Sequence, residues 1–190
     1  MTLAAAILSA LLALSPVEAP HESVPGWAES ADQRAARYAS IADDVAAAVT
    51  DACASSAEAA TCQRRAAALL VGLAWHESGF APDVDAGDCY RGRDGRGPRC
   101  DSGRAVSLWQ LQGSADERAL WRDRRQAARR ALRAAGRSLG ACRRNADEER
   151  LAAYAGGRCE HPTARRRARE LAAAVQRAER AMPATEEARP

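Results

Sequence analysis

Apolar side chains recur at helical spacing along most of this 190-residue chain. In the stretch from Trp27 to Ala52, Tyr38, Ile41, Val45 and Val49 repeat every three or four residues, which indicates an amphipathic helix. No segment shows the strict alternation of a half-buried strand. The chain is therefore predicted to be mostly α-helical, with further helices from about residue 59 or 62 to 78, and over 115–135 (closed by Gly136), 147–154 and 163–182.

A carboxylate continues the apolar face of the second predicted helix. Leu69, Leu70 and Leu73 lead at i, i+3, i+4 spacing to Glu77, and Gly79 supplies the residue that ends a helix. The carbonyl end of a helix and partial burial both disfavour a negative charge at this point. Both effects favour a neutral carboxylic acid, which is the form that a general acid needs near neutral pH. Glu77 is therefore the first candidate catalytic residue.

The chain begins with an apolar run, Leu3 to Leu14, followed by the small-x-small sequence Val17-Glu18-Ala19. This pattern is typical of a secretory signal peptide, and an uncleaved anchor or a different start codon is the alternative. The run is shorter than the about 20 residues that cross a bilayer, so no stable membrane insertion is expected after leader cleavage. The predicted organisation is a signal peptide at 1–19, a linker at 20–26, one domain at 27–182 and a flexible tail at 183–190.

Six cysteines follow the apolar leader, and an even number in this context indicates disulfides in an exported protein. Six cysteines allow 15 pairings. No pair has Cys-x-x-Cys spacing, which disfavours a zinc site, and we expect no metal and no cofactor. The favoured pairing is the short-range one: Cys53–Cys62, Cys89–Cys100 and Cys142–Cys159.

All 28 basic residues are arginine, against 25 acidic residues, so the chain is only mildly basic. This balance disfavours a nucleic-acid-binding protein and suits weak attraction to an anionic cell envelope. Arg122, Arg125, Arg129 and Arg133 share one predicted helical face, opposite an apolar stripe that begins at Leu120. We expect a solvated face with some acidic pairing, and contact with wall phosphates is the alternative.

Three segments between about residues 60 and 160 together resemble the soluble lytic transglycosylase family. They are Glu77-Ser78-Gly79-Phe80, Ala105-Val106-Ser107-Leu108-Trp109-Gln110 and Ala153-Tyr154-Ala155-Gly156-Gly157, and they occur in the family's order. The resemblance implies a lysozyme-like helical domain, here with a disulfide-stapled loop insert between the first two segments.

The resemblance implies cleavage of the MurNAc–GlcNAc bond in peptidoglycan glycan strands, with a 1,6-anhydro product. Glu77 would act first as general acid and then as general base, with Tyr154 holding its orientation. Gln110 or Ser107 would donate to the substrate's acetamido group, Ser78 would be a further binding residue, and Trp109 would stack on sugar or pack in the core. The expected protein is an exported monomer in the periplasm or outside the cell, with glycan strands as its partner and no nucleic acid.

The chain also departs from the family pattern. Arg104 and Ser107 stand where the family has glycines, Trp109 replaces a methionine and Ala155 replaces an asparagine. These changes keep open a catalytically silent glycan-binding module as an alternative function.

A second alternative concerns the residues after the Glu77 helix. An aspartate from 83–88 (Asp83, Asp85 or Asp88) would activate a water, in a hydrolase similar to goose-type lysozymes; the simpler interpretation is turn-forming, solvated aspartates. His76 precedes Glu77 but points about 100° away on a helix, which predicts a structural histidine without a direct proton relay.

Overall fold

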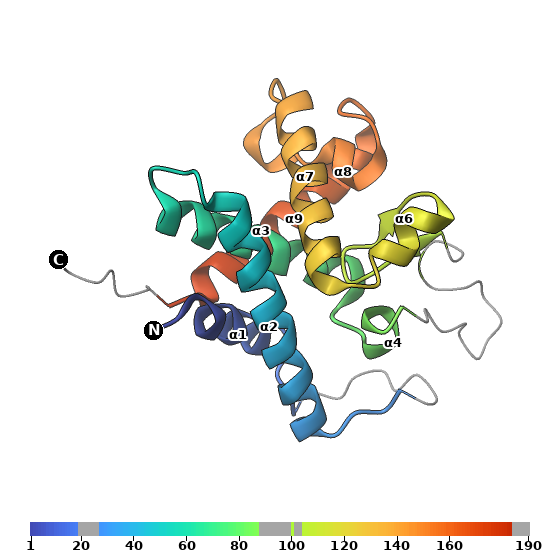
Figure 1. Cartoon of the computed structure of the whole chain (residues 1–190). Helices are drawn as coiled ribbons and strands as arrows, with labels where there is room; N and C mark the ends of the chain where they lie inside the picture. Colours follow the sequence, from blue (N-terminus) through green and yellow to red (C-terminus); the bar gives the residue numbers. More distant parts are fainter. Residues whose placement is uncertain (19–26, 88–99, 101–103, 184–190) are drawn as a thin grey trace.

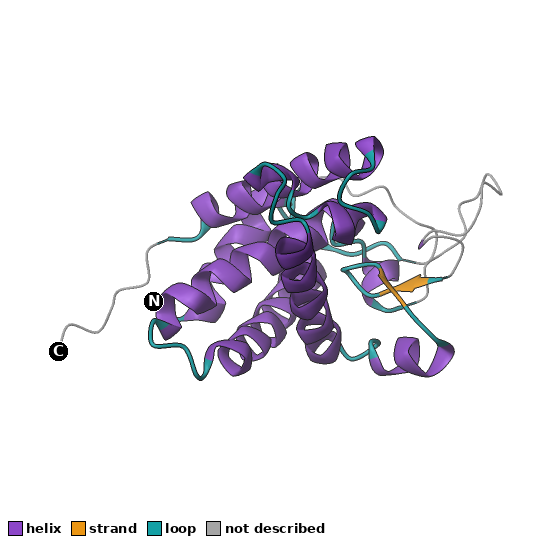
Figure 2. Cartoon of the chain, turned by 90° about the horizontal axis from the view of Figure 1, so that it is seen from above, coloured by secondary structure: helices purple, strands orange, loops and turns teal. Residues whose placement is uncertain are grey.

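Helices make up nearly all of the regular structure in the computed structural model, which describes residues 1–18, 27–87, 100 and 104–183 (Figure 1). Figure 2 shows the helices packed against one another, with the small hairpin of β-strands at one side. The predicted mostly α-helical class is confirmed. In chain order the elements are α1 Leu3–Leu14, α2 Ala31–Cys53, α3 Ala59–Ser78, α4 Pro82–Asp85, β1 Ala105–Val106, β2 Leu111–Gln112, α6 Ala115–Leu120, α7 Arg124–Ala141, the 3₁₀ turn η1 Asp147–Glu149, α8 Ala152–Gly156 and α9 Pro162–Ala181.

Helix α3 lies at the centre of the core, where it packs against α1, α2, α7 and most extensively against α9. Its buried face is formed by small and branched side chains from Ala67 to Ala74. Gly72 lets the two helices approach, because a Cβ atom at this position would lie 2.5 Å from the backbone N and Cα of Val175. The end of α3 that carries Glu77 is thereby held firmly against α9.

The predicted helix boundaries hold for α2, α3 and α9 to within a few residues. At the end of α3, Gly79 takes the left-handed conformation with a φ of 58°, as its position in the sequence predicts. Ser30 and Gln33 form a reciprocal capping box at the start of α2. Local sequence signals therefore place the helix that presents Glu77.

The single helix predicted over 115–135 is wrong, because the structure divides it into α6 and α7. Asp123 starts the second helix, its carboxylate accepting the backbone N–H of Gln126 at 2.8 Å. Trp121 turns into the core between the two helices, whereas Leu120, predicted to be on the apolar stripe, is 65% exposed. Gly136, predicted to end the helix, lies inside α7.

A two-stranded antiparallel hairpin joins β1 to β2 and was not predicted. Each strand has only two residues, too few to show an alternating pattern. The segment predicted as a short helix over 147–154 also differs, since it forms the turn η1 and then α8. Asn145, expected to cap that helix, instead donates from its side chain to the Cys159 carbonyl at 2.8 Å.

The apolar N-terminal run folds as α1 and packs on α2, α3 and α9. The side chains of Ile7 and Leu11 are fully buried, and the Tyr38 hydroxyl donates to the Ser15 hydroxyl oxygen at 2.8 Å. Among the described residues, no helix combines the length and apolar character needed to cross a membrane. Cleavage of a leader at 1–19 stays a prediction, and the linker and the tail lie mostly outside the described residues.

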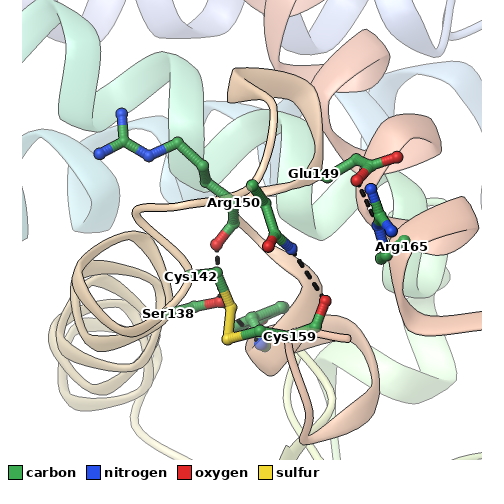
Figure 3. Close-up of a disulfide and its surroundings, with 8 residues drawn as sticks. Ser138, Cys142, Glu149, Arg150, Cys159 and Arg165 are labelled. Carbon is green, nitrogen blue, oxygen red and sulfur yellow. Dashed lines mark hydrogen bonds and ion pairs between the residues drawn. A yellow bond between two sulfur atoms is a disulfide. The ribbon is translucent and has the colours of Figure 1, made fainter. Parts of the chain in front are cut away.

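Two of the three predicted disulfides are confirmed. Cys53–Cys62 joins the end of α2 to the start of α3, and Cys142–Cys159 joins the end of α7 to the segment before α9 (Figure 3). Cys89 of the third predicted pair, Cys89–Cys100, lies outside the described residues. The second disulfide closes a loop that contains all of α8.

Candidate functional site

A cavity of about 830 Å³ lies between the end of α3, one face of α7, α8, α9 and the segment 105–112 that contains β1 and β2, called the hairpin segment below. This volume is within the usual range of small-molecule and cofactor sites. Three predicted site residues besides Glu77 line it: Trp109, Gln110 and Tyr154. Ser78 and Ser107 are not among its lining residues in the described part of the chain.

Glu77 reaches the cavity from the last turn of α3 with a side chain that is only 11% exposed. Among the described residues that line the cavity, Glu77 is the only acidic one. The described part of the cavity lining therefore offers a single, nearly buried carboxylate.

Two basic side chains lie close to this carboxylate. Arg167 of α9 approaches Glu77 Oε2 with its Nη2 at 3.5 Å, and His76 Nδ1 lies 3.5 Å from Oε1. The sequence argument that His76 points away from Glu77 is wrong, because the two side chains at the helix end lie close enough for a charge interaction. His76 Nδ1 has no aligned hydrogen bond, so this contact acts through charge. Its Nε2 lies 3.5 Å from Glu170 Oε2 on α9.

The pKa of His76 is raised above its ordinary value, first by the contact with the Glu77 carboxylate and further by Glu170; partial burial and Arg167 oppose the shift. The Glu77 carboxylate thus lies between two basic groups, the Arg167 guanidinium and the His76 imidazole.

His76→Gln is expected to destabilise the protein slightly at about pH 6 and to have less effect at about pH 8.5. A raised folded-state pKa means that the stabilisation is complete below the ordinary value of 6.5 and is lost as the pH rises through the folded-state value. Because the contact is partly exposed, the effect should stay below about 1 kcal/mol. Thermal unfolding at both pH values measures it. His161→Gln, at the start of α9, is the control, and an equal destabilisation by His76→Gln at both pH values contradicts the assignment.

Tyr154 of α8 lines the cavity but does not make the expected hydrogen bond to Glu77. Its hydroxyl donates to the Trp109 carbonyl at 3.0 Å. Its pKa is raised, first by burial and then by the negative charge of Glu77, so the phenol remains a proton donor. The geometry makes Tyr154 a brace between α8 and the hairpin segment, close enough to Glu77 to feel its charge.

Ser138 was not singled out from the sequence, although it holds Tyr154 in place. Its buried hydroxyl donates to the Arg150 carbonyl at 3.0 Å (Figure 3). The same hydroxyl oxygen accepts the backbone N–H of Tyr154 at 2.9 Å. A serine inside a predicted helix gives no signal for such a role, because its partners follow only from the packing of α7 against the later segment.

The two predicted binding residues at the tip of the hairpin segment, Trp109 and Gln110, have different environments. Trp109 is 1% exposed and its indole N–H donates to the Leu70 carbonyl at 2.9 Å, so its ring belongs to the core. Gln110 lines the cavity, and its amide donates to the Ser107 carbonyl at 3.1 Å. From this segment, Gln110 and Gln112 both line the cavity with polar side chains.

The two predicted serines lie outside the cavity lining. Ser107 is buried with a φ of 68°, the left-handed region that glycine adopts most easily, which fits the glycine that the resemblance places there. The Ser78 hydroxyl donates to the Ala74 carbonyl at 2.8 Å and accepts the Phe80 N–H at 3.3 Å. Ser78 therefore closes the helix end.

The aspartates after α3 do not line the cavity in the described part of the chain. Asp85 pairs with Arg124 at 2.7 Å and with Arg37 at 3.6 Å, and its pKa is raised, first by burial, against the effect of these arginines. Asp83 is completely buried. The interpretation of both as solvated aspartates is wrong, and Asp88 lies outside the described residues.

The arginine face predicted on the helix over 115–135 is partly confirmed as a paired surface. Arg125 and Arg129 of α7 both form ion pairs with Asp51 of α2. This pairing occupies two of the four arginines and leaves the opposite side of α7 to form the cavity wall.

Fold and site together define a helical, disulfide-bonded protein with one carboxylate in the described lining of a ligand-sized cavity. Comparisons with protein-family models, with curated proteins and with solved structures found no match for the chain.

Proposed function

We propose that the protein is a peptidoglycan lytic transglycosylase that cleaves the MurNAc–GlcNAc bond and leaves a 1,6-anhydro end. The observation that carries this proposal is the single carboxylate, Glu77, in the described lining of the cavity. The proposed fold is lysozyme-like, and the two disulfides support export to the periplasm or the cell exterior.

One carboxylate suffices for this reaction. Protonated Glu77 donates its proton to the glycosidic oxygen as the C1–O bond breaks. The resulting carboxylate accepts the proton of the muramic acid C6 hydroxyl, whose oxygen bonds to C1 and closes the anhydro ring. Glu77 is again protonated, and water is not consumed. The attacking hydroxyl belongs to the substrate, which gives it a high effective concentration.

A hydrolase needs a further group to activate or replace water. In most glycosidases this is a second carboxylate about 5–9.5 Å from the first. Asp85 is bound by two arginines and Asp83 is fully buried, so neither is presented to the cavity. The described site therefore favours transglycosylation over hydrolysis.

The basic neighbours of Glu77 act differently in the two halves of the reaction. A charged Arg167 or His76 stabilises the carboxylate that accepts the C6 hydroxyl proton, but disfavours the acid that starts the cleavage. The Arg167 contact is long at 3.5 Å, and its side chain is 43% exposed, which makes the pair weak.

A silent glycan-binding module is the second candidate function. It is favoured by the pairing of Glu77 with Arg167 and by the missing Tyr154–Glu77 hydrogen bond.

Digestion of purified peptidoglycan, followed by mass spectrometry of the soluble products, tests the proposal. We expect muropeptides with 1,6-anhydro ends, which are lighter by one water than hydrolysis products. Reducing ends would replace the proposal with a hydrolase. Sacculus binding without soluble product would replace it with the silent module.

A further inference from the structure

The wall that α7 contributes to the cavity carries two arginines, Arg130 and Arg137. They are seven residues apart, so they lie on the same side of the helix, two turns or about 10.5 Å apart. Ala134 and Ala141 also line this wall, and their small side chains leave the space beside the arginines open. Neither arginine was singled out from the sequence.

The two arginines differ in their surroundings. Arg130 lies over the Trp121 ring, with its guanidinium carbon 5.4 Å from the ring centroid. The pKa of Glu117 is lowered first by its hydrogen bonds with Ser114, and the charge of Arg130 contributes least. Arg137 is exposed and forms no ion pair or hydrogen bond with the described residues. Arg137 is therefore the more available cation of this wall.

The aromatic side chains in the described lining of the cavity do not offer a stacking surface for a neutral sugar. The Trp109 ring is buried in the core and the Tyr154 hydroxyl is engaged by a backbone carbonyl. The only acidic side chain in the described lining, Glu77, already faces Arg167. The cavity thus has an excess of positive charge, and that excess lies on the α7 wall.

We propose that the α7 wall is a subsite for carboxylate-bearing substituents of the glycan, with Arg137 as its principal ligand and Arg130 as a second one. This inference rests on the proposed function for the identity of the glycan. Each muramic acid carries a lactyl group that ends in a carboxylate or in a peptide. A guanidinium binds a carboxylate through two parallel N–H donors. The separated arginines suit successive carboxylates better than one phosphate, which is usually held by donors converging on it.

Binding of defined oligosaccharides to the Glu77→Gln variant, which lacks the proton donor for cleavage, tests the subsite independently of turnover. The probes are a GlcNAc–MurNAc tetrasaccharide with free lactyl carboxylates and the neutral GlcNAc tetrasaccharide, each titrated calorimetrically at low and high salt. We expect the acidic probe to bind about tenfold tighter at low salt, with most of this difference lost at high salt. Arg137→Gln should remove most of the preference and leave binding of the neutral probe unchanged.

Arg133→Gln is the matched control, because Arg133 is exposed on the same helix and is not among the lining residues. Arg130→Gln should reduce the preference less, with its thermal unfolding measured because the stacking on Trp121 is lost. Equal affinity of the Glu77→Gln protein for both probes, or an unchanged preference when Arg137→Gln is added to it, overturns the proposal. Tighter binding of a polyglycerol phosphate chain that depends on Arg137 also overturns it, in favour of phosphate.

Failure of this inference differs from failure of the proposed function. Anhydro products without a carboxylate preference would remove the subsite and keep the transglycosylase. A preference that depends on Arg137, without any cleavage of peptidoglycan, would keep the subsite and remove the transglycosylase.

Discussion

Glu77→Gln is expected to reduce peptidoglycan cleavage by about 10²–10⁴-fold, the usual contribution of a general acid or base. The substitution keeps the size of the side chain and removes its ability to give and take a proton. Release of anhydromuropeptides per unit time, measured by chromatography with mass detection, gives the effect. Because Glu77 is the only acidic residue in the described lining, no neighbouring carboxylate is placed to replace it.

The control is Glu58→Gln, which makes the same chemical change at the opposite end of α3. Glu58 is exposed and its side chain makes no capping hydrogen bond. Full activity is expected for this variant. Equal thermal unfolding of both variants would show that the Glu77 effect is chemical. Activity of Glu77→Gln within a factor of a few of the wild type would refute the proposed mechanism.

Gly72→Ala is expected to lower the free energy of unfolding by about 3 kcal/mol or more, the upper part of the range for overpacked cores. The added Cβ would lie 2.5 Å from the Val175 backbone, which cannot move as a flexible side chain would. Helices α3 and α9 must therefore separate. For a domain of this size the melting temperature should fall by roughly 6–12 °C, measured by circular dichroism.

Gly136→Ala, a substitution at another helical glycine, is expected to change the stability in the opposite direction. A Cβ atom there would have nothing within 4 Å. Alanine is the better helix former, so this variant should be more stable by about 0.5–1 kcal/mol. A destabilised Gly136→Ala, or a Gly72→Ala as stable as the wild type, would contradict the assigned roles of these glycines.

Local signals in the sequence predict the helix that carries Glu77 and its end at Gly79. The hydrophobic row, the glycine and the cysteine spacing each act over a few residues, and the structure agrees with them. The division between α6 and α7 was missed because Trp121 turns into the core there, a preference that only tertiary packing expresses. The same limit applies to β1 and β2.

The candidate site was likewise predicted only in part. Glu77, Gln110 and Tyr154 reach the cavity from segments that the sequence singled out. The contacts around them were not predictable, because Arg167, Ser138 and Arg137 come from helices brought together by folding. His76 shows the limit of reasoning from helical geometry alone. Neighbouring residues leave a helix in different directions, yet the side chains of His76 and Glu77 come within 3.5 Å of each other where α3 packs on α9.

The Cys142–Cys159 disulfide encloses the whole of α8, and with it every cavity residue from Ala153 to Gly157. The bond joins the two ends of this segment covalently, in addition to the hydrogen bonds by which Ser138 of α7 holds it. We expect reduction of the bond to loosen this side of the cavity while the rest of the core stays packed. Because disulfides form and persist in oxidising compartments, this side of the cavity should be most rigid there.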